Sequence, residues 1–228
     1  MAPREPRLFH AAKRVLDVVV AGALVVALAP LGLLIAALIK LDTPGPVFFV
    51  QQRMGCRLRR RGGRAVWETR RFGCLKFRSM VHNADQSLHQ AHIKAFVEGR
   101  LQPGNGAERG ASVKLRGDRR ITRVGGILRR TSLDELPQLL NVLAGDMSLV
   151  GPRPVPLYEV AEYQPGHYGR LTSLPGITGL WQTTGRAQVS FDEMIELDLQ
   201  YIRRRSLWQD LRLLALTVPA VLSGRGAE

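Results

Sequence analysis

Two adjacent carboxylates, Asp134 and Glu135, are the residues in this sequence best suited to do chemistry. They follow a basic pair, Arg129 and Arg130, and precede an apolar, helix-compatible segment, where charge is hard to explain by solubility alone. The free N–H groups and positive dipole end of a helix N-terminus favour phosphate as well as carboxylate. We therefore interpret the pair as a reacting centre. The spacing from Ser132 to Glu135 is also typical of a capping box, and helix capping is the commoner role.

Four basic side chains are candidates to bind an anion. Lys76 and Arg78 share one face of the strand expected over residues 72–80. Arg153 is fixed between two prolines in a rigid loop, and a preorganised guanidinium can hold a phosphate at two points. Arg186 belongs to a second basic loop with several glycines. The alternatives are a solvated strand face for the first two residues and a purely structural turn at the prolines.

Positive charge is concentrated in the first part of the chain. Residues 1–130 contain 25 Lys and Arg against 8 Asp and Glu, whereas residues 131–228 contain 8 against 11. A strongly basic half indicates an anionic partner, which can be a nucleic acid, an acidic membrane surface or a phosphorylated substrate. Aromatic residues make up only 6% of the chain, so the interleaving typical of a base-stacking surface is missing. We expect no nucleic-acid partner.

Residues 15–39 form an apolar run of 25 residues that is interrupted only by Asp17. A helix needs about 20 such residues to cross a bilayer, so the run predicts a membrane segment. It exceeds the apolar core of about 7–15 residues in cleaved signal peptides, and no small-residue cleavage site precedes a mature domain. A signal peptide is therefore not expected.

Pro30 lies just past the midpoint of this run and predicts a kink, because proline removes a backbone hydrogen bond and clashes with the preceding turn. Basic residues flank both ends, with Lys13 and Arg14 before the run and Lys40 after it. If both flanks prefer the cytoplasmic face, a helix that enters and leaves by the same leaflet satisfies them, whereas a straight span does not. An ordinary proline-kinked span is the alternative. Asp17 is expected at headgroup depth, where it could pair with either preceding basic residue.

The whole chain favours one principal unit of the α+β class, mostly helical, with a small β-hairpin and amphipathic helices at the membrane interface. We expect a basic leader at residues 1–12, a re-entrant membrane helix at 13–40, a cytosolic globular catalytic domain at 41–222 and a tail at 223–228. The hairpin turn is expected at Gly62 and Gly63, and helices are expected over residues 81–97, 191–201 and 207–222.

Histidine and cysteine spacings offer little further chemistry. His89 and His92 are three residues apart in the first expected helix, a spacing that could hold a metal, but no third ligand is evident nearby. We expect surface histidines. Cys56 and Cys74 lack a Cys-x-x-Cys spacing and indicate reduced thiols in a cytoplasmic compartment.

Nine motifs stand in one order between about residue 13 and residue 222. They are Lys-Arg-Val-Leu-Asp at 13–17, the proline of the apolar run, Gly-Pro-Val-Phe-Phe at 45–49 with Gln-Arg-x-Gly at 52–55, Lys-Phe-Arg-Ser-Met at 76–80, Thr-Ser-Leu-Asp-Glu-Leu-Pro-Gln-Leu at 131–139, Gly-Asp-Met-Ser-Leu-Val-Gly-Pro-Arg-Pro at 145–154, Pro-Gly-Ile-Thr-Gly at 175–179, Gly-Arg at 185–186 and Glu-Leu-Asp at 196–198. Together they resemble the bacterial sugar transferase family, the small monotopic polyprenol-phosphate phosphoglycosyl transferases.

The resemblance implies a reaction at the cytoplasmic leaflet of the bacterial inner membrane. A nucleoside-diphosphate sugar, here a UDP-sugar, gives its sugar-1-phosphate to a polyprenol phosphate such as undecaprenyl phosphate and releases UMP. This is the first membrane step of polysaccharide or glycoconjugate assembly. In this family an aspartate at the Asp134 position is the nucleophile and forms a covalent phosphosugar intermediate, and Glu135 is its partner. Mg²⁺ is required, with both carboxylates as its expected ligands, because carboxylate attack on a diphosphate needs a cation to offset repulsion.

The resemblance also assigns other positions. Arg153 and Arg186 match family positions expected to hold the donor phosphates, whereas Lys76 and Asp198 match positions close to the site. The family's re-entrant helix, broken at proline, favours that topology for Pro30. The sequence departs from the common family pattern at Ala29 in place of serine, Arg119 in place of proline and Thr184 in place of asparagine. None of these departures removes a reactive group.

Two other functions stay open at the level of the sequence. A membrane-anchored basic binding module would use the positive charge without chemistry, but it leaves the two carboxylates and the Gly-Pro-Arg-Pro loop unexplained. A hydrolase would use a similar site with water as the final acceptor. A homodimer is compatible with the sequence, and the sugar and the glycan pathway are not identified by it.

Overall fold

The computed structural model describes residues 7–62, 64–100, 118–184 and 189–222. These residues form a mostly helical α+β structure with a small sheet built on a β-hairpin, as the sequence predicts, and with a second sheet of two short strands. The helices are α1 (Arg7–Asp42), α2 (Ser87–Val97), α3 (Arg123–Arg130), α4 (Gln138–Ala144), α5 (Leu157–Val160), α6 (Leu180–Thr184), α7 (Phe191–Arg204) and α8 (Leu207–Leu222), with 3-10 turns η1 (Leu133–Glu135) and η2 (Pro165–Leu171). The strands are β1 (Phe48–Arg61), β2 (Arg64–Phe77), β3 (Ser148–Val150), β4 (Val155–Pro156) and β5 (Gly176–Thr178).

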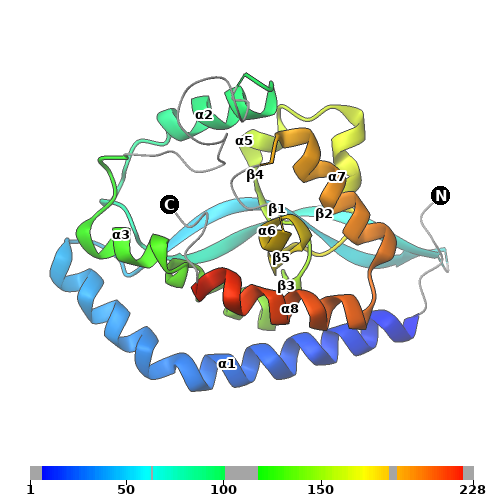
Figure 1. The fold of residues 1–228 in the computed structure, drawn as a ribbon, viewed down its shortest axis with the longest axis horizontal. Helices are drawn as coiled ribbons and strands as arrows, with labels where there is room; N and C mark the ends of the chain where they lie inside the picture. Colours follow the sequence, from blue (N-terminus) through cyan, green and yellow to red (C-terminus); the bar gives the residue numbers. More distant parts are fainter. Residues whose placement is uncertain (1–6, 63, 101–117, 185–188, 223–228) are drawn as a thin grey trace.

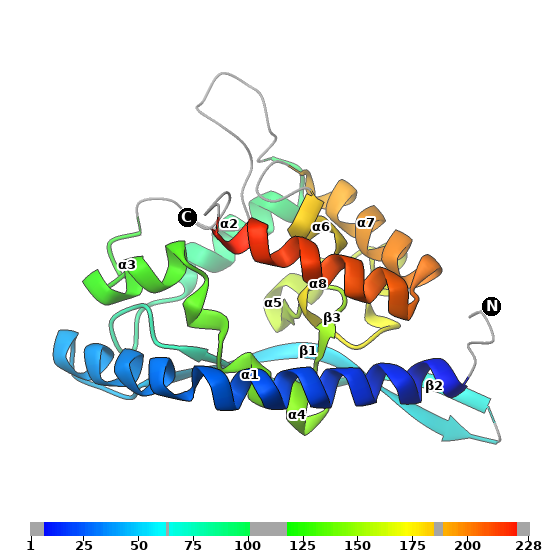
Figure 2. The ribbon, with the colours of Figure 1, turned by 60° about the horizontal axis from the view of Figure 1, so that its bottom comes forward.

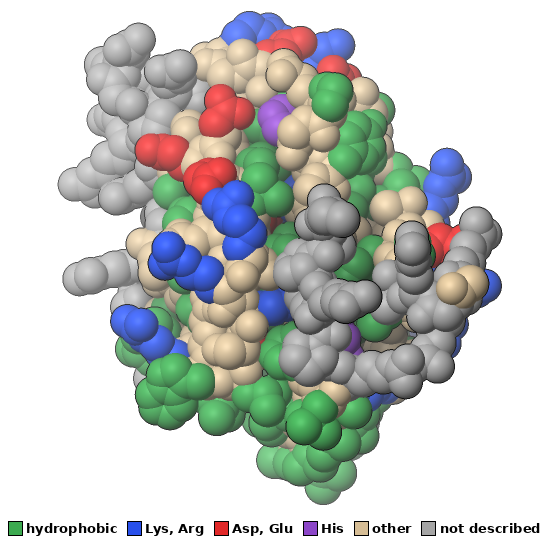
Figure 3. All heavy atoms as spheres, turned by 90° about the vertical axis from the view of Figure 1, so that its right-hand side faces the viewer, with side chains coloured by type: hydrophobic (Ala, Val, Ile, Leu, Met, Phe, Trp, Pro, Cys, Tyr) green, Lys and Arg blue, Asp and Glu red, His purple; other side chains and the backbone are tan. Residues whose placement is uncertain are grey.

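The long helix α1 forms one edge of the molecule and runs along the bottom of Figure 1. It continues through Pro30 without interruption, and it is long and apolar enough to cross a membrane. Many of its apolar side chains are exposed, including Val26 and Leu33, and Figure 3 shows hydrophobic side chains gathered along this lower edge. Such a large exposed apolar surface is typical of a membrane contact. The predicted kink and the re-entrant topology stay predictions.

The N-terminal part of α1 is tied to the globular part by buried polar contacts. Lys13 Nζ donates to Asp210 Oδ2 of α8 at 2.6 Å, with both side chains almost fully buried. The Asp17 carboxylate accepts hydrogen bonds from Ser148 Oγ and from the Leu149 amide, each at 3.0 Å. The expectation that Asp17 pairs at the membrane surface with a basic neighbour of its own helix is therefore corrected, because β3 supplies its hydrogen-bond donors.

The sheet is built on the predicted hairpin. β1 and β2 pair antiparallel from Phe48 opposite Phe77 to Arg61 opposite Arg64, so the turn begins at Gly62, and Gly63 lies outside the described residues. Gly62 has a φ of +56°, the left-handed conformation that such a turn requires. Both strands are longer than the sequence indicated. β4 joins the outer edge of β1, and β3 pairs with β5 in a separate two-stranded parallel sheet.

The helical predictions were confirmed for α7 and α8 and partly for α2. The helix expected over residues 81–97 begins only at Ser87, because the preceding segment turns at Asn83, whose φ is +59°. The side chains of Ser190 and Glu193 form a capping box that starts α7. Figure 2 shows α8 beside α7 and above α1 in that view.

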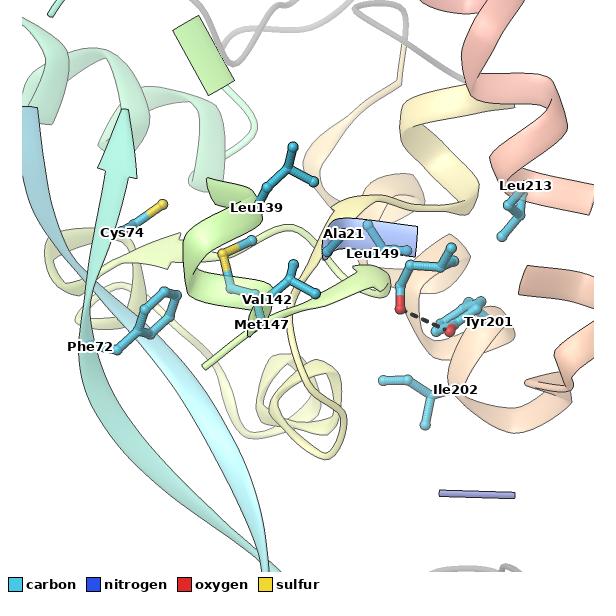
Figure 4. Packing of buried hydrophobic residues seen from close by; sticks show 11 residues of the cluster. Ala21, Phe72, Cys74, Leu139, Val142, Met147, Leu149, Tyr201, Ile202 and Leu213 are labelled. Carbon is cyan, nitrogen blue, oxygen red and sulfur yellow. Dashed lines mark hydrogen bonds between the residues drawn. The ribbon is translucent and has the colours of Figure 1, made fainter. Parts of the chain in front are cut away.

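The main core joins α1 to the globular part. Ala21 of α1 is fully buried in one cluster with Val142 of α4 and Tyr201 of α7 (Figure 4). The Tyr201 hydroxyl donates to the Val150 carbonyl at 3.1 Å, which joins α7 to β3. Cys74 lies in the same cluster, and both cysteines are free thiols, as expected. A second cluster surrounds Phe96, Trp181 and Phe191, and a third packs the end of α1 on Phe77.

Candidate functional site

Asp134 and Glu135 lie in η1, a single 3-10 turn between α3 and α4. The capping box expected from Ser132 does not form: this residue has a left-handed φ of +57° and makes no side-chain cap. Lys76 of β2 meets the carboxylates instead. Its ammonium lies 2.6 Å from Glu135 Oε1 and 3.9 Å from Asp134 Oδ2. Asp134 is only 8% exposed, so its carboxylate is held in a partly desolvated, positively charged environment.

Helix α3 carries Arg129 to the same place. Thr122 caps this helix by accepting a hydrogen bond from the Gly125 amide at 3.0 Å. Gly125 packs so closely that a Cβ there would lie 2.0 Å from the Ser79 carbonyl oxygen. At the other end of the helix, Arg129 is half-buried, and Asp134 is among the charges that act on it. The close contact at the glycine therefore sets the position of a guanidinium beside the carboxylate.

A pocket of about 380 Å³ opens beside Asp134 and has three kinds of lining. The cationic side chains are Arg53, Lys76, Arg78, Arg120, Arg129 and Arg153. The apolar wall includes Phe48, Phe49, Val50, Phe77, Met80 and Val81, and the first three are exposed at the start of β1. Uncharged polar side chains include Gln51, His89 and Tyr158. A pocket of this composition suits a ligand with a phosphorylated part and an apolar part.

The proline-flanked arginine lies where the sequence led us to expect an anion ligand. Arg153 lines this pocket and also a small cavity that is shared with Lys76 and Glu135. Its guanidinium lies 5.9 Å from the ring centroid of Trp181, a cation–π distance. Its loop packs backbone to backbone on residues 175–179, and a Cβ on Gly176 would lie 2.1 Å from a backbone nitrogen of that loop. The two glycine-containing loops therefore act as one rigid support.

Arg78 has structural contacts that the sequence did not indicate. Its guanidinium donates to the carbonyl oxygens of Thr43 at 2.7 Å, of Ile39 at 3.4 Å and of Pro44. These carbonyls lie at the C-terminal end of α1, so Arg78 stabilises that end and is only 4% exposed. A role in substrate binding stays a prediction for this residue.

Asp198 is fully buried in α7 and lines neither of the two pockets described above. Its carboxylate lies 2.6 Å from Arg170, which also contacts Glu159 and Tyr163. Burial raises the pKa of Asp198 to about 6, and the Arg170 charge opposes that rise. This arrangement indicates that Asp198 orders the region between α5, η2 and α7. Arg186 lies outside the described residues.

Several pocket residues were not assigned by the sequence. Arg53 lies within a motif that we quoted, and its buried guanidinium donates to the Pro154 carbonyl at 2.7 Å. Arg129 belonged to the basic pair before the carboxylates. His89 is not the surface histidine we expected, because Tyr158 of α5 lies 2.6 Å from its Nδ1 atom. Helix α5 is too short to be predicted, and no sequence signal brings it to α2.

The two carboxylates can supply part of the coordination of a Mg²⁺ ion. Mg²⁺ in proteins is commonly held by one or two carboxylates together with substrate phosphates. Asp134 and Glu135 provide two carboxylates. No group of three or more His, Cys, Asp or Glu side chains that could hold a metal occurs among the described residues, 7–62, 64–100, 118–184 and 189–222. A donor diphosphate would have to complete the coordination.

Comparisons with known proteins show the family to which the chain belongs. The model of the bacterial sugar transferase family matches residues 8–224. The chain is 41% identical, over 95% of its length, to the exopolysaccharide production protein ExoY of Rhizobium meliloti and covers 88% of that protein. It is 42% identical over 92% of its length to a UDP-glucose:undecaprenyl-phosphate glucose-1-phosphate transferase of Caulobacter vibrioides, covering 70% of it. It is 39% identical to the undecaprenyl-phosphate galactose phosphotransferase of Salmonella typhimurium and covers 41% of that protein.

These relatives define the class of protein: the chain is an enzyme, a phosphoglycosyl transferase. It belongs to the bacterial sugar transferase family, as the nine motifs predicted.

Proposed function

We propose that this enzyme transfers a sugar-1-phosphate from a UDP-sugar to undecaprenyl phosphate, at the cytoplasmic face of the bacterial inner membrane. The observation that carries the proposal is a carboxylate pair beside a pocket that is cationic on one side and apolar on another. The relatives named for undecaprenyl-phosphate sugar transfer support the acceptor, and those named for UDP-glucose support the donor. The exopolysaccharide relatives support a role in polysaccharide synthesis.

The reaction proceeds in two displacements at one phosphorus atom. First, an Asp134 carboxylate oxygen attacks the phosphorus that bears the sugar, and the bond from this phosphorus to the UMP oxygen breaks. UMP leaves with the electron pair, so no proton is needed, and an aspartyl-phosphosugar forms. Second, an oxygen of the lipid phosphate attacks the same phosphorus. This breaks the bond to Asp134, restores its carboxylate and gives the lipid diphosphate sugar.

The cationic side chains lower the barrier to both steps. Lys76 offsets the charge of Glu135, its nearest carboxylate, and so lowers repulsion of an approaching diphosphate. Arg129 and Arg153 extend from α3 and from the rigid loop toward the same pocket, where they can bind the phosphate oxygens. A Mg²⁺ ion held by the two carboxylates and the donor would supply further charge neutralisation.

Both ends of α1 contact the same globular part, which supports a re-entrant membrane helix. Near the N-terminal end, Lys13 pairs with Asp210 in α8. At the C-terminal end, Arg78 in the 77–82 segment holds the carbonyls of Ile39 and Thr43. A helix whose two ends are bound by one folded unit is expected to keep both ends on the side of the bilayer where that unit lies. The exposed start of β1 then lies beside α1, where a lipid acceptor can approach along the apolar wall.

Intact-mass analysis tests the nucleophile. After addition of a UDP-sugar and Mg²⁺, the unmodified enzyme should gain the mass of one phosphosugar, and Asp134→Asn should gain none. The Asp146→Asn variant is a matched control, since Asp146 pairs with Arg70 away from the pocket. An adduct on Asp134→Asn would disprove the assignment.

Incubation with radiolabelled donor and undecaprenyl phosphate separates the proposed transferase from its alternatives. A lipid-linked product supports the transfer. Free sugar phosphate without a lipid-linked product would contradict undecaprenyl phosphate as the acceptor, and the absence of any product would contradict the UDP-sugar as the donor.

A further inference from the structure

Three uncharged polar side chains form a connected group on the wall of the pocket. Gln51 comes from β1, Tyr158 from α5 and His89 from α2, and all three are half-buried. The proposed reaction uses none of them. Neither of the carboxylates at the reacting centre is among their described hydrogen-bond partners. They therefore differ in charge from the groups that would hold the diphosphate.

Their hydrogen bonds run in one direction. Arg53 Nη2 donates to Gln51 Oε1 at 2.5 Å, and Gln51 Nε2 donates to the Tyr158 hydroxyl at 3.5 Å. That hydroxyl lies 2.6 Å from His89 Nδ1. A guanidinium can only donate, so the amide must turn its oxygen toward it, and the hydroxyl keeps its own proton for Nδ1. His89 then carries its proton on Nε2, which leaves that N–H as a donor.

Both ring side chains are uncharged at neutral pH. Burial, with the nearby charges of Arg53 and Arg153, lowers the pKa of His89 to about 4. Burial also raises the pKa of Tyr158 above its usual value. The neutral Nε2–H of His89 and the remaining acceptor site on the Tyr158 hydroxyl suit hydroxyl groups of a ligand, whereas phosphate oxygens gain more from the neighbouring arginines.

The group is also held in place before any ligand binds. β4 pairs with β1, with Met54 opposite Val155, and α5 follows β4 directly, which fixes Tyr158 beside Gln51. Phe96 anchors α2 by an edge-on ring contact with Phe191. A preformed set of hydrogen-bonding groups can discriminate strongly between ligands that do and do not satisfy it.

We propose that Gln51, Tyr158 and His89 form a subsite for the hydroxyl groups of the donor, outside its diphosphate. The inference rests on the proposed function, because it takes the ligand to be a nucleoside-diphosphate sugar. The phosphates are held by the arginines near Asp134, so the hydroxyl-bearing parts extend along the pocket wall. Both the transferred sugar and the ribose carry neighbouring hydroxyls, and the experiment distinguishes these two sources.

Binding is measured by calorimetry in the Asp134→Asn background, where no transfer consumes the donor. Tyr158→Phe removes one hydroxyl and keeps the ring, and it should weaken UDP-glucose binding by about five- to tenfold, the effect of losing one buried hydrogen bond. If the sugar is bound, UDP-glucose or UDP-galactose binding weakens while UDP binding is unchanged. If the ribose is bound, all three ligands weaken equally.

Tyr168→Phe is the matched control, because Tyr168 is exposed on η2 and does not line the pocket. It should leave all three affinities unchanged. A second pair of variants tests the histidine: His89→Gln keeps an N–H donor and should bind better than His89→Leu.

Two outcomes overturn the inference, and they are distinguishable. If UDP-sugars bind to Asp134→Asn and Tyr158→Phe changes no affinity by more than about twofold, the subsite is wrong while the proposed donor stands. If no nucleoside-diphosphate sugar binds to the Asp134→Asn parent, the proposed function and the subsite both fail.

Discussion

The position of Lys76 decides how two neighbouring carboxylates can share one small site. Its ammonium lies 2.6 Å from Glu135 Oε1 and 3.9 Å from Asp134 Oδ2. Two neighbouring carboxylates raise each other's energy, and a nearby cation offsets this repulsion. The lysine therefore makes it easier for the first carboxylate to stay ionised and act as a nucleophile.

Replacing this lysine should reduce the rate of the reaction without preventing the enzyme from folding. We expect Lys76→Met to lower the rate of adduct formation by about 10²-fold, as for the loss of one positioned charge at a reacting centre. Quenched-flow mass analysis measures that rate. Lys94→Met is the control, since Lys94 pairs with Glu162 on an exposed part of α2. An unchanged rate in Lys76→Met would contradict the role.

Ser132 stores backbone strain two residues before Asp134. Its φ of +57° is uncommon for any residue with a Cβ and especially unfavourable for a β-branched one. We expect Ser132→Val to lower the free energy of unfolding by about 1–2 kcal/mol, whereas Ser132→Gly should be tolerated. Denaturant unfolding in detergent measures both. Equal stability of the two variants would show that the conformation at this position is not a constraint.

Among single residues, the sequence pointed to those whose neighbours along the chain are unusual. The carboxylate pair and the proline-flanked Arg153 were singled out from the sequence, and they line the two pockets together, although their roles stay predictions. Arg78 was recognised as basic, but no local pattern reveals that its partners are the carbonyls at the end of α1. The same holds for Asp198, whose partner Arg170 lies in η2. Long-range partners are fixed by packing, which the sequence does not display.

Among the elements, α3 offers the most direct test of how packing positions the site. Gly125 and Gly126 are adjacent in one short helix, but only the first is pressed against another backbone, at Ser79. The second would place its Cβ 4.0 Å from its nearest neighbour atom. Alanine substitutions at these two positions therefore distinguish the effect of helix propensity from the effect of close packing.

Gly126→Ala should preserve or raise stability, because alanine is favoured over glycine in a helix by about 1 kcal/mol. Gly125→Ala should displace α3 together with Arg129, and a shift of about 1 Å can reduce a rate by about 10²-fold. Thermal unfolding and transfer rates of both variants provide the comparison. Equal transfer rates would show that the position of α3 does not control the site.

Element existence was easier to predict from the sequence than element length. The hairpin turn and α8 were expected from glycine punctuation and apolar content, and both are present. The start of α2 was placed too early, because the turn at Asn83 has no strong signal. Short elements such as α5 and η1 have too few residues for a periodic pattern, and they form where the neighbouring strands and helices leave room.

For the molecule as a whole, the sidedness of α1 is the main topological prediction. Single cysteines at the exposed positions Ala11 and Leu41 flank the apolar run. In inverted inner-membrane vesicles an impermeant maleimide should label both, and in right-side-out spheroplasts it should label neither. The parent chain gives the background, which should be low because both native cysteines are buried. Labelling of the two positions from opposite sides would overturn the re-entrant topology.

The buried contacts between α1 and the globular part also limit how this enzyme can be simplified. Ala21 is fully buried in the main core, and Lys13 supplies the counter-charge of Asp210. Deletion of the helix would leave that aspartate as an uncompensated buried charge and open the largest apolar cluster to solvent. A truncated version without α1 is therefore not expected to fold into an active enzyme. Inhibitor screening and crystallisation will need the full chain, purified with the lipid or detergent that its membrane helix requires.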